Sequence, residues 1–143
     1  MTVEFTVPGP PGHKGRPRFR SMGKYVQVYT DHKTKDYEKY VADCWEKTGS
    51  HKLTGELWVF VTAFFAPPKS TTKKARAAMA QNYVGYQHKP DADNVGKVVL
   101  DALNGKAYDD DNKITLLHIE KIYSEEPRVN VKLVEREAKT CEP

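Results

Sequence analysis

The sequence predicts an α+β fold in which helices pack on one face of a single mixed β-sheet. A segment near the start of the chain alternates apolar and polar residues, which is typical of a half-buried strand, and a segment in the middle is rich in β-branched and aromatic residues. The segments between them place apolar residues at helical spacing. Along the chain the order is β-β-α-β-α-α-β-β, which indicates a mixed α+β domain with its helices against one sheet.

The first third of the chain predicts two strands and one helix. Residues 2–7 alternate as a strand does, and the proline-rich stretch 8–12 ends it because proline has no N–H to donate to a sheet. A basic segment, residues 13–20, follows. Residues 25–30 predict a second short strand, and residues 33–48 predict a helix with an apolar and aromatic stripe.

The remainder predicts three strands and two helices. Glu56 to Phe65 is the strongest strand because β-branched and aromatic residues dominate it, and it belongs to the core or to a surface between subunits. Residues 70–80 predict a basic helix with a Ser or Thr cap, and residues 92–104 predict a helix closed by Asn-Gly. Residues 114–123 and 128–135 predict two final strands, and the Glu-Glu-Pro sequence between them indicates a hairpin.

The length of 143 residues favours one domain. We assign it to residues 1–137 and expect residues 138–143 to form a disordered tail. No run approaches the ~18 apolar residues of a membrane helix, and the N-terminus lacks the basic and apolar regions of a secretory signal. Two cysteines, Cys44 and Cys141, form neither a disulfide framework nor a zinc-ligand spacing. We therefore expect a cytoplasmic protein.

Charge is unevenly distributed along the chain. Residues 1–90 carry 15 Lys/Arg and 7 Asp/Glu, a net charge of +8, whereas residues 91–143 carry 8 and 12, a net charge of −4. A basic half joined to clustered acids predicts a polyanionic partner and a separate acidic site. The alternative is a solvated surface of uneven charge.

Two basic runs are candidate DNA-binding segments, since phosphate contacts supply affinity without sequence information. Phe19 and Tyr25 interleave with the first run and belong either to a DNA-contacting surface or to the core. The first run comprises Lys14, Arg16, Arg18, Arg20 and Lys24. The second comprises Lys69, Lys73, Lys74, Arg76 and Lys89, with no acidic residue from 69 to 89.

The predicted helix over residues 92–104 has two distinct faces. At ~100° per residue, its valines fall on one face, which anchors it to the sheet. Asp93, Lys97 and Asp101 stack in one column on the opposite face at spacings of four residues, and Asp91 stands at the helix start. This face offers carboxylates and an ammonium together. The alternative is that Asp91 is an ordinary N-cap and Asp101 pairs with Lys97.

A second acidic group, Asp109 to Asp111, follows this helix. Adjacent carboxylates repel one another, and a hard cation such as Mg²⁺ or Mn²⁺ cancels that repulsion. A short return from helix to strand would bring the run near Asp91 and Asp93. The alternative is a solvated turn. An EF-hand is excluded because Val95 and Ala102 occupy two of its ligand positions.

Other chemistries fit the sequence poorly. It contains no glycine-rich phosphate loop and no Gly-x-Ser-x-Gly motif. The five histidines are scattered without paired spacing, so we interpret them as surface or core residues.

The acidic motif resembles that of the RusA family of Holliday junction resolvases, small endodeoxyribonucleases often encoded by bacteriophages and prophages. The likeness lies in Asp91-x-Asp93-Asn94-x-x-Lys97, then Asp101-Ala-Leu-Asn-Gly105, then Asp110-Asp111-x-x-Ile114. The opening is also similar to many members, in Val7-Pro-Gly-Pro-Pro, Lys14-Gly-Arg-Pro-Arg18 and Tyr29-Thr30. The resemblance extends from residue 3 to about residue 134.

The resemblance implies a homodimer with a RusA-like fold that binds four-way DNA junctions and makes paired, metal-dependent nicks. It implies Mg²⁺, or Mn²⁺, held by Asp91, Asp93 and a downstream aspartate, with Lys97 as a catalytic lysine. The family pattern aligns Asp111 with the downstream position, but the additional Asp109 leaves the choice between Asp110 and Asp111 open. Lys113 stands where the family often has glutamine.

We therefore expect a structure-selective endodeoxyribonuclease that resolves Holliday junctions in recombination and repair. The residues alone indicate an acidic cluster, a metal ion and a polyanionic partner, and the branched substrate follows from the resemblance. Two alternatives stay open at this point. One is a non-catalytic DNA-binding or structural protein, and the other is a nuclease acting on flaps or single strands.

Overall fold

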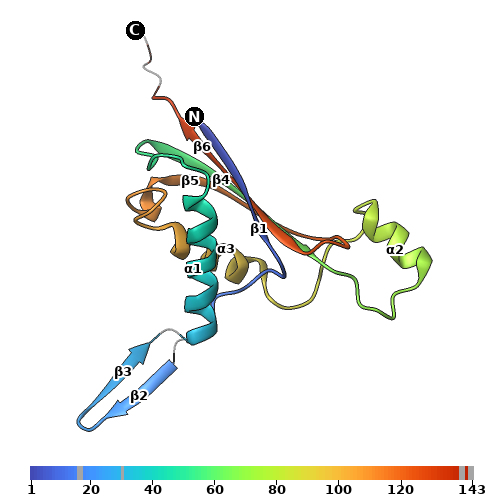
Figure 1. Ribbon diagram of the computed structural model, residues 1–143, viewed down its shortest axis with the longest axis horizontal. Coiled ribbons are helices and arrows are strands. Elements are labelled where there is room, and N and C mark those ends of the chain that lie inside the picture. The colour runs from blue at the N-terminus through green and yellow to red at the C-terminus, as the bar shows by residue number, and fades with distance from the viewer. Residues whose placement is uncertain (16–17, 30, 139–140, 142–143) are drawn as a thin grey trace.

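The computed structural model describes residues 1–15, 18–29, 31–138 and 141. A four-stranded sheet forms the body, two helices cover it, and a two-stranded ribbon and a third helix project from it (Figure 1). The elements in chain order are β1 (Thr2–Pro8), β2 (Arg18–Met22), β3 (Tyr25–Tyr29), α1 (His32–Glu46), β4 (Glu56–Phe65), α2 (Lys73–Ala80), α3 (Ala92–Leu103), a 3₁₀ turn η1 (Asp111–Lys113), β5 (Ile114–Tyr123) and β6 (Arg128–Arg136).

The main sheet is mixed, as predicted, with the strand order β1-β6-β4-β5. β6 pairs antiparallel with both β1 and β4, whereas β4 and β5 are parallel. Parallel neighbours need a crossover connection. Residues 66–113 make this crossover, and they carry α2, α3 and every aspartate of the predicted site.

The predicted hairpin between the last two strands is wrong. β5 and β6 are consecutive, but β4 lies between them and pairs with both. Val61, for example, is opposite Ile119 on one side and Val131 on the other. A short turn shows only that two strands are close in sequence, and the long apolar β4 takes the central position, where its inward side chains are fully buried.

The core lies between the sheet and two helices, α1 and α3, which pack against each other. Val59 and Val61 of β4 are fully buried, as are Val95, Val98 and Val99 of α3. The apolar face predicted for residues 92–104 is therefore confirmed. The sequence left open whether this strand belongs to the core or to a surface between subunits. For the inward face of β4, the answer is the core.

Helix α2 does not pack on this face of the sheet. The prediction that all helices cover one face of the sheet is therefore wrong for α2. α2 has no buried residue and lies beyond the end of the sheet (Figure 1). Its sequence, Lys-Lys-Ala-Arg-Ala-Ala-Met-Ala, is mostly small and basic. Such a helix buries little apolar area, so it gains little from docking on the sheet.

β2 and β3 form a ribbon that projects from the body (Figure 1). The sequence predicted β3, but β2 was not predicted; it begins in the segment 13–20, which was expected only to be basic. Phe19 and Tyr25 are 69% and 64% exposed, so they are surface residues rather than core. Thr30, the last residue of the predicted strand, lies outside the described residues, as do Arg16 of the first basic run and residues 139, 140, 142 and 143 of the predicted tail.

None of the helices in the described ranges is long and apolar enough to cross a membrane. The homodimer implied by the resemblance stays a prediction at this stage.

The contact of α3 with β5 is tight at Gly96. A Cβ built on Gly96 collides with the end of the Ile119 side chain. We expect Gly96→Ala to lower the free energy of unfolding by about 1 kcal/mol, because overpacking outweighs the gain in helix propensity. In an Ile119→Val background, which removes the obstructing methyl group, Gly96→Ala should instead stabilise the protein. Urea unfolding of the four proteins tests this reversal, and equal effects in both backgrounds would contradict it.

Candidate active site

The amino-terminal end of α3 presents the first two predicted acids. Asp91 is the N-cap residue, Asp93 lies in the first turn, and both are exposed together with Lys97. At the other helices, Asp31 and Thr72 accept hydrogen bonds from backbone N–H groups of the first turn. Asp91 makes no such bond. Its carboxylate is therefore available for other chemistry, and the ordinary-cap interpretation fails for this residue.

A cavity of about 410 Å³ opens beside Asp91. Its wall combines one carboxylate, one amide, two lysines and one imidazole in a small volume. The lining residues are His13, Lys14, Gly15, Lys89, Pro90, Asp91 and Asn94. Segments almost eighty positions apart in the sequence thus meet at this end of α3.

Backbone hydrogen bonds hold the segment around Lys14 against α3 and α1. The Lys14 N–H donates to the Asn94 carbonyl at 3.1 Å, and the Gly15 N–H donates to Thr34 Oγ1 at 3.0 Å. A Cβ on Gly15 would collide with Asp31 and Thr34, so the close approach requires glycine here.

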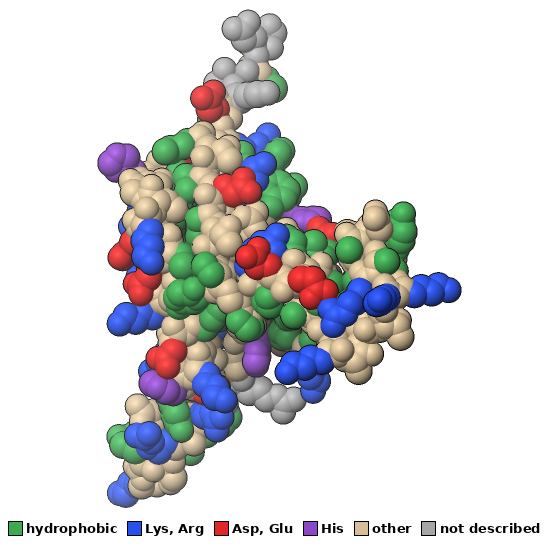
Figure 2. All heavy atoms as spheres, turned by 45° about the vertical axis from the view of Figure 1, so that its right-hand side comes forward, with side chains coloured by type: hydrophobic (Ala, Val, Ile, Leu, Met, Phe, Trp, Pro, Cys, Tyr) green, Lys and Arg blue, Asp and Glu red, His purple; other side chains and the backbone are tan. Residues whose placement is uncertain are grey.

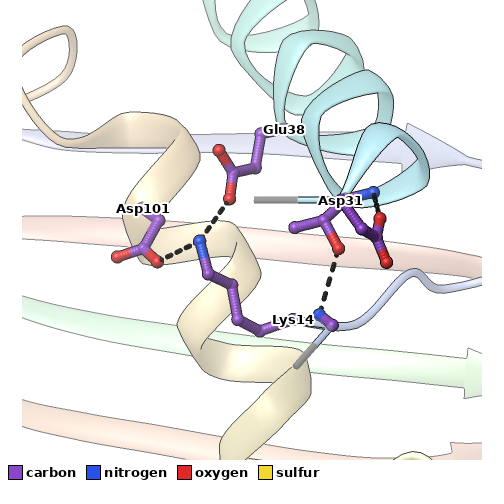
Figure 3. Close-up of polar contacts among 6 residues, drawn as sticks. Lys14, Asp31, Glu38 and Asp101 are labelled. Atoms are coloured by element: carbon purple, nitrogen blue, oxygen red, sulfur yellow. Dashed lines mark hydrogen bonds and ion pairs between the residues drawn. The ribbon is translucent and has the colours of Figure 1, made fainter. Parts of the chain in front are cut away.

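The Lys14 ammonium joins the two core helices (Figure 3). Its Nζ lies 2.8 Å from Glu38 of α1 and 2.9 Å from Asp101 of α3. Burial works to lower the pKa of Lys14, but the hydrogen bonds and charges of the two carboxylates raise it above its ordinary value. Asp101 therefore pairs with Lys14, not with Lys97 as one alternative held.

The downstream aspartates follow α3, and one of them, Asp111, is held near the carboxyl-terminal end of this helix. The Tyr108 hydroxyl lies 2.9 Å from Asp111 Oδ1 and 2.8 Å from the Leu100 carbonyl oxygen. Tyr108 is fully buried, and burial together with the Asp111 carboxylate raises its pKa far above the ordinary value. Asp110 caps η1, and Asp109 pairs with Lys52 at 3.1 Å.

Within one chain, these acidic residues do not lie close enough together to share a metal ion. Asp91 stands at the start of α3, while Asp111 is held beside Leu100, about 13 Å further along the axis at ~1.5 Å per residue. No group of three potential ligands suited to a metal ion occurs within the described ranges. The expected return of the Asp109–Asp111 run to Asp91 and Asp93 does not occur within a chain, because Tyr108 ties the run to the other end of a rigid helix. The donors at each end suit Mg²⁺ chemically, but neither end alone supplies a complete set.

The predicted DNA-binding residues fall on three parts of the surface. Lys and Arg side chains project from the ribbon at the lower left and from the region of α2 at the right (Figure 2). The exposed cations are Arg18, Arg20 and Lys24 on the ribbon, Lys69 before α2, Lys73 and Lys74 on α2, and Lys89 at the cavity. Arg76 is bound to Glu125 and to the Pro68 carbonyl, and Lys14 is bound as described above.

Two residues at the site were not predicted to be functional. His13 lines the cavity, and Tyr108 holds Asp111. No periodicity identifies either role, since both depend on contacts between separate segments. The position of Tyr108 directly before the aspartates was the available signal.

Comparisons with known proteins identify the family of this chain. A model of the family described as "Endodeoxyribonuclease RusA" matches residues 8–134, which include the cavity, α3 and the downstream aspartates. The chain is also similar to "Uncharacterized protein YqaN" of Bacillus subtilis (strain 168). The two are 35% identical over 139 residues, which cover 93% of this chain and 96% of that protein.

The ion pairs of Lys14 predict a specific loss of stability. Lys14→Met leaves Glu38 and Asp101 without their shared cation, so we expect the free energy of unfolding to fall by about 1–2 kcal/mol at neutral pH. The deficit should shrink as the pH rises through the pKa of Lys14, which lies above its ordinary value in the folded protein, because the wild-type lysine then loses its stabilising charge. Urea unfolding from neutral to alkaline pH measures both effects. Lys24→Met, at the exposed turn of the ribbon, is the control, and a similar loss in that variant would refute the explanation.

Proposed function

Because this chain belongs to the RusA endodeoxyribonuclease family, we propose that it is a metal-dependent, structure-selective endodeoxyribonuclease that resolves Holliday junctions by paired nicks in DNA recombination and repair. The observation that carries the proposal is the exposed start of α3. There the Asp91 carboxylate is not used for capping, Asp93 and Lys97 follow on the same helix, and a cavity lined by basic side chains opens alongside.

The proposed reaction is hydrolysis of a phosphodiester. A water oxygen forms a bond to phosphorus, and the bond from phosphorus to one sugar oxygen breaks. The water loses one proton and the leaving oxygen gains one, so the products are a phosphate monoester and an alcohol. Negative charge grows on the phosphate and on the leaving oxygen, and we assign its stabilisation to the ammonium of Lys97, which is one turn after Asp93.

We propose Mg²⁺ as the cofactor, with Mn²⁺ as a substitute. Asp91 and Asp93 supply oxygen ligands at one end of α3, and Asp111, or its neighbour Asp110, supplies the downstream ligand. When bound, such an ion lowers the pKa of a water molecule toward ~7 and polarises the phosphate. The separation of these acids within one chain leaves the ligand set incomplete until a further group joins it.

DNA binding is assigned to the exposed cations of the ribbon and of α2. Arg18, Arg20 and Lys24 lie on the ribbon, where no acidic residue occurs from position 5 to position 30. Lys73 and Lys74 lie on α2. Contacts from these residues to phosphates would hold the duplex arms, and a two-fold homodimer would match the near-symmetry of a four-way junction.

Asp91→Asn is expected to lower the Mg²⁺-dependent nicking rate on a synthetic four-way junction by more than about 100-fold, because it removes a metal ligand. Affinity for the junction should stay within about twofold, since the carboxylate makes no structural hydrogen bond. Gel assays of cleavage and of binding in Ca²⁺ measure the two effects. Asp43→Asn, an exposed aspartate of α1, is the matched control. An Asp91→Asn variant that cleaves at the normal rate would refute the role.

The substrate class has its own test. The initial rates of nicking on a junction, a flap, a single strand and a linear duplex rank the candidate substrates. A preference for the junction supports a resolvase, whereas a preference for the flap or the single strand would reassign the nuclease. No cleavage of any substrate would favour the non-catalytic alternative.

The ribbon assignment predicts a change in salt dependence. Replacing Arg18, Arg20 and Lys24 with glutamine should reduce the slope of log K against log salt by up to about 3 for a duplex arm, because each phosphate contact contributes about 0.9. The same loss of charge on α1 and its C-cap, with Lys33, Lys39 and Lys47 replaced, is the control. Fluorescence anisotropy at several salt concentrations gives both slopes, and equal slopes in the two triple variants would contradict the assignment.

A further inference from the structure

The start of α3 is anchored differently from the starts of α1 and α2. The Asp31 and Thr72 side chains cap those two helices by accepting a hydrogen bond from a backbone N–H of the first turn. The Asp91 carboxylate makes no such bond. A carboxylate that holds a metal ion has to keep one position, and this requires support from surrounding residues. The support for Asp91 therefore has to come from outside α3.

The loop that leads into α3, residues 84–90, is not held by burial. His88 and Lys89 are exposed, as is Asp91 after them. Within the described residues, the loop makes one hydrogen bond from backbone to backbone, between the Tyr86 N–H and the Lys121 carbonyl, at 3.2 Å. The position of the loop therefore depends on side chains that bind its carbonyl groups.

Lys121 of β5 is one such side chain. Its Nζ lies 2.8 Å from the His88 carbonyl oxygen and 2.8 Å from the Pro90 carbonyl oxygen. Hydrogen bonds from an ammonium are stronger than those between neutral groups. The Pro90 carbonyl belongs to the peptide unit that joins Pro90 to Asp91, so the second bond acts directly on the residue at the helix start.

Tyr86 ties the same loop to the sheet. Its hydroxyl donates to the Lys89 carbonyl at 2.8 Å, and its ring centre lies 5.3 Å from the Lys121 ammonium. The ring stacks on Phe65 at the end of β4, with centroids 3.9 Å apart and planes at 4°. The three consecutive carbonyls of residues 88–90 are therefore all bound by Lys121 or Tyr86.

Asp91 is consequently held on both sides by its backbone. The carbonyl before it is bound by Lys121, and its own carbonyl accepts a hydrogen bond from the Val95 N–H at 3.1 Å. A capping bond would also fix Asp91, but it would occupy a carboxylate oxygen that a cation needs. Anchoring through the backbone leaves the carboxylate available.

We propose that Lys121 is a positioning residue of the active site, whose ammonium fixes the backbone before Asp91 and thereby the place of the Asp91 carboxylate. This inference rests on the proposed nuclease function and deepens it. An ammonium has three protons to donate, and Lys121 directs two of them at loop carbonyls. Lys121 thus acts through Asp91, whereas Lys97 is assigned to the reacting phosphate.

Lys121→Met tests the proposal, because it removes the ammonium and keeps an unbranched side chain beside the Tyr86 ring. We expect the Kd for Mn²⁺, measured by electron paramagnetic resonance of the free ion, to rise about tenfold. The Mg²⁺ concentration for half-maximal nicking of a four-way junction should rise by a similar factor. The KM for the junction should stay within about twofold, because Lys121 makes its contacts with the loop.

Lys132→Met is the matched control. Lys132 lies on β6, which β4 separates from β5, and its ammonium is 5.9 Å from the centre of the Phe60 ring. The control therefore loses the same charge from beside an aromatic ring, at a distance from the loop. Its Mn²⁺ affinity should equal that of the wild-type protein. An equal loss of affinity in the two variants would assign the effect to charge alone and overturn the proposal.

Restoring the ammonium separates positioning from a general loss of structure. Lys121→Cys is made together with Cys141→Ser, so that the remaining native cysteine, Cys44, is buried. Alkylation with 2-bromoethylamine joins an aminoethyl group to the introduced sulfur, which loses its proton as bromide leaves. The alkylated protein should regain the Mn²⁺ affinity of the Cys141→Ser protein to within about threefold, and the unmodified protein should stay about tenfold weaker. Alkylation without recovery would count against a positioning role.

Tyr86→Phe gives a milder perturbation, which keeps the test open if Lys121→Met does not fold. It removes the hydrogen bond to the Lys89 carbonyl and keeps the ring that stacks on Phe65. We expect the Kd for Mn²⁺ to rise by about twofold to threefold. Hydrogen exchange over residues 86–95 of the metal-free protein should be faster than in the wild type. Unchanged exchange and unchanged Mn²⁺ affinity would show that the loop needs no such anchor.

The outcomes separate this inference from the proposed function. If the wild-type protein cleaves the junction and Lys121→Met cleaves it with the same dependence on Mg²⁺, the positioning role is refuted and the proposed function stands. If the wild-type protein shows no metal-dependent cleavage, the proposed function fails. The Mn²⁺ affinities and the hydrogen exchange then still decide whether Lys121 positions Asp91.

Discussion

The burial of one face of α3 against the sheet is the constraint on which the candidate site depends. Val95, Val98 and Val99 are fully buried, and Gly96 allows the helix to approach Ile119 of β5 closely. The orientation of α3 is therefore fixed, and with it the direction of its polar face. Because the helix is a rigid spacer, the acids at its two ends cannot approach each other by local rearrangement. The packing of the core thus keeps the two groups of acidic residues apart within a single chain.

Lys14 extends this constraint to the amino-terminal segment. Its ammonium lies between carboxylates of the two core helices, and its backbone N–H bonds to α3. The segment that carries His13 is consequently held against the start of α3 and forms one wall of the cavity. Lys14 belongs to the first basic run, which the sequence predicted to bind DNA, but its role in the structure is to hold the core helices together. The exposed cations of that run lie further along the chain, on the ribbon.

Periodicity and composition predicted the helices and strands that bury one face and expose the other. The strand at Glu56 to Phe65 was predicted with its observed bounds, because β-branched and aromatic residues dominate it. The two faces of α3 were predicted from the helical spacing of its apolar and polar residues. β2 was missed because all five of its residues are exposed, which leaves no alternating burial to detect. The order of strands in the sheet was beyond prediction, because it depends on pairing between segments that are far apart in the sequence. The role of Tyr108 was missed because it depends on the burial of its ring and on its contact with Leu100, which no periodicity reveals.

The ribbon of β2 and β3 has a consequence for the thermodynamics of recognition. Its register places Phe19 and Val28 opposite each other on one face and Arg20 beside Tyr29 on the other, and it extends away from the body. An isolated two-stranded hairpin is only marginally stable in water. In the proposed complex, ordering the ribbon on a nucleic acid would offset part of the favourable contact free energy with lost conformational entropy. Burial of its apolar face would give association a negative heat-capacity change, so the enthalpy of binding would change with temperature.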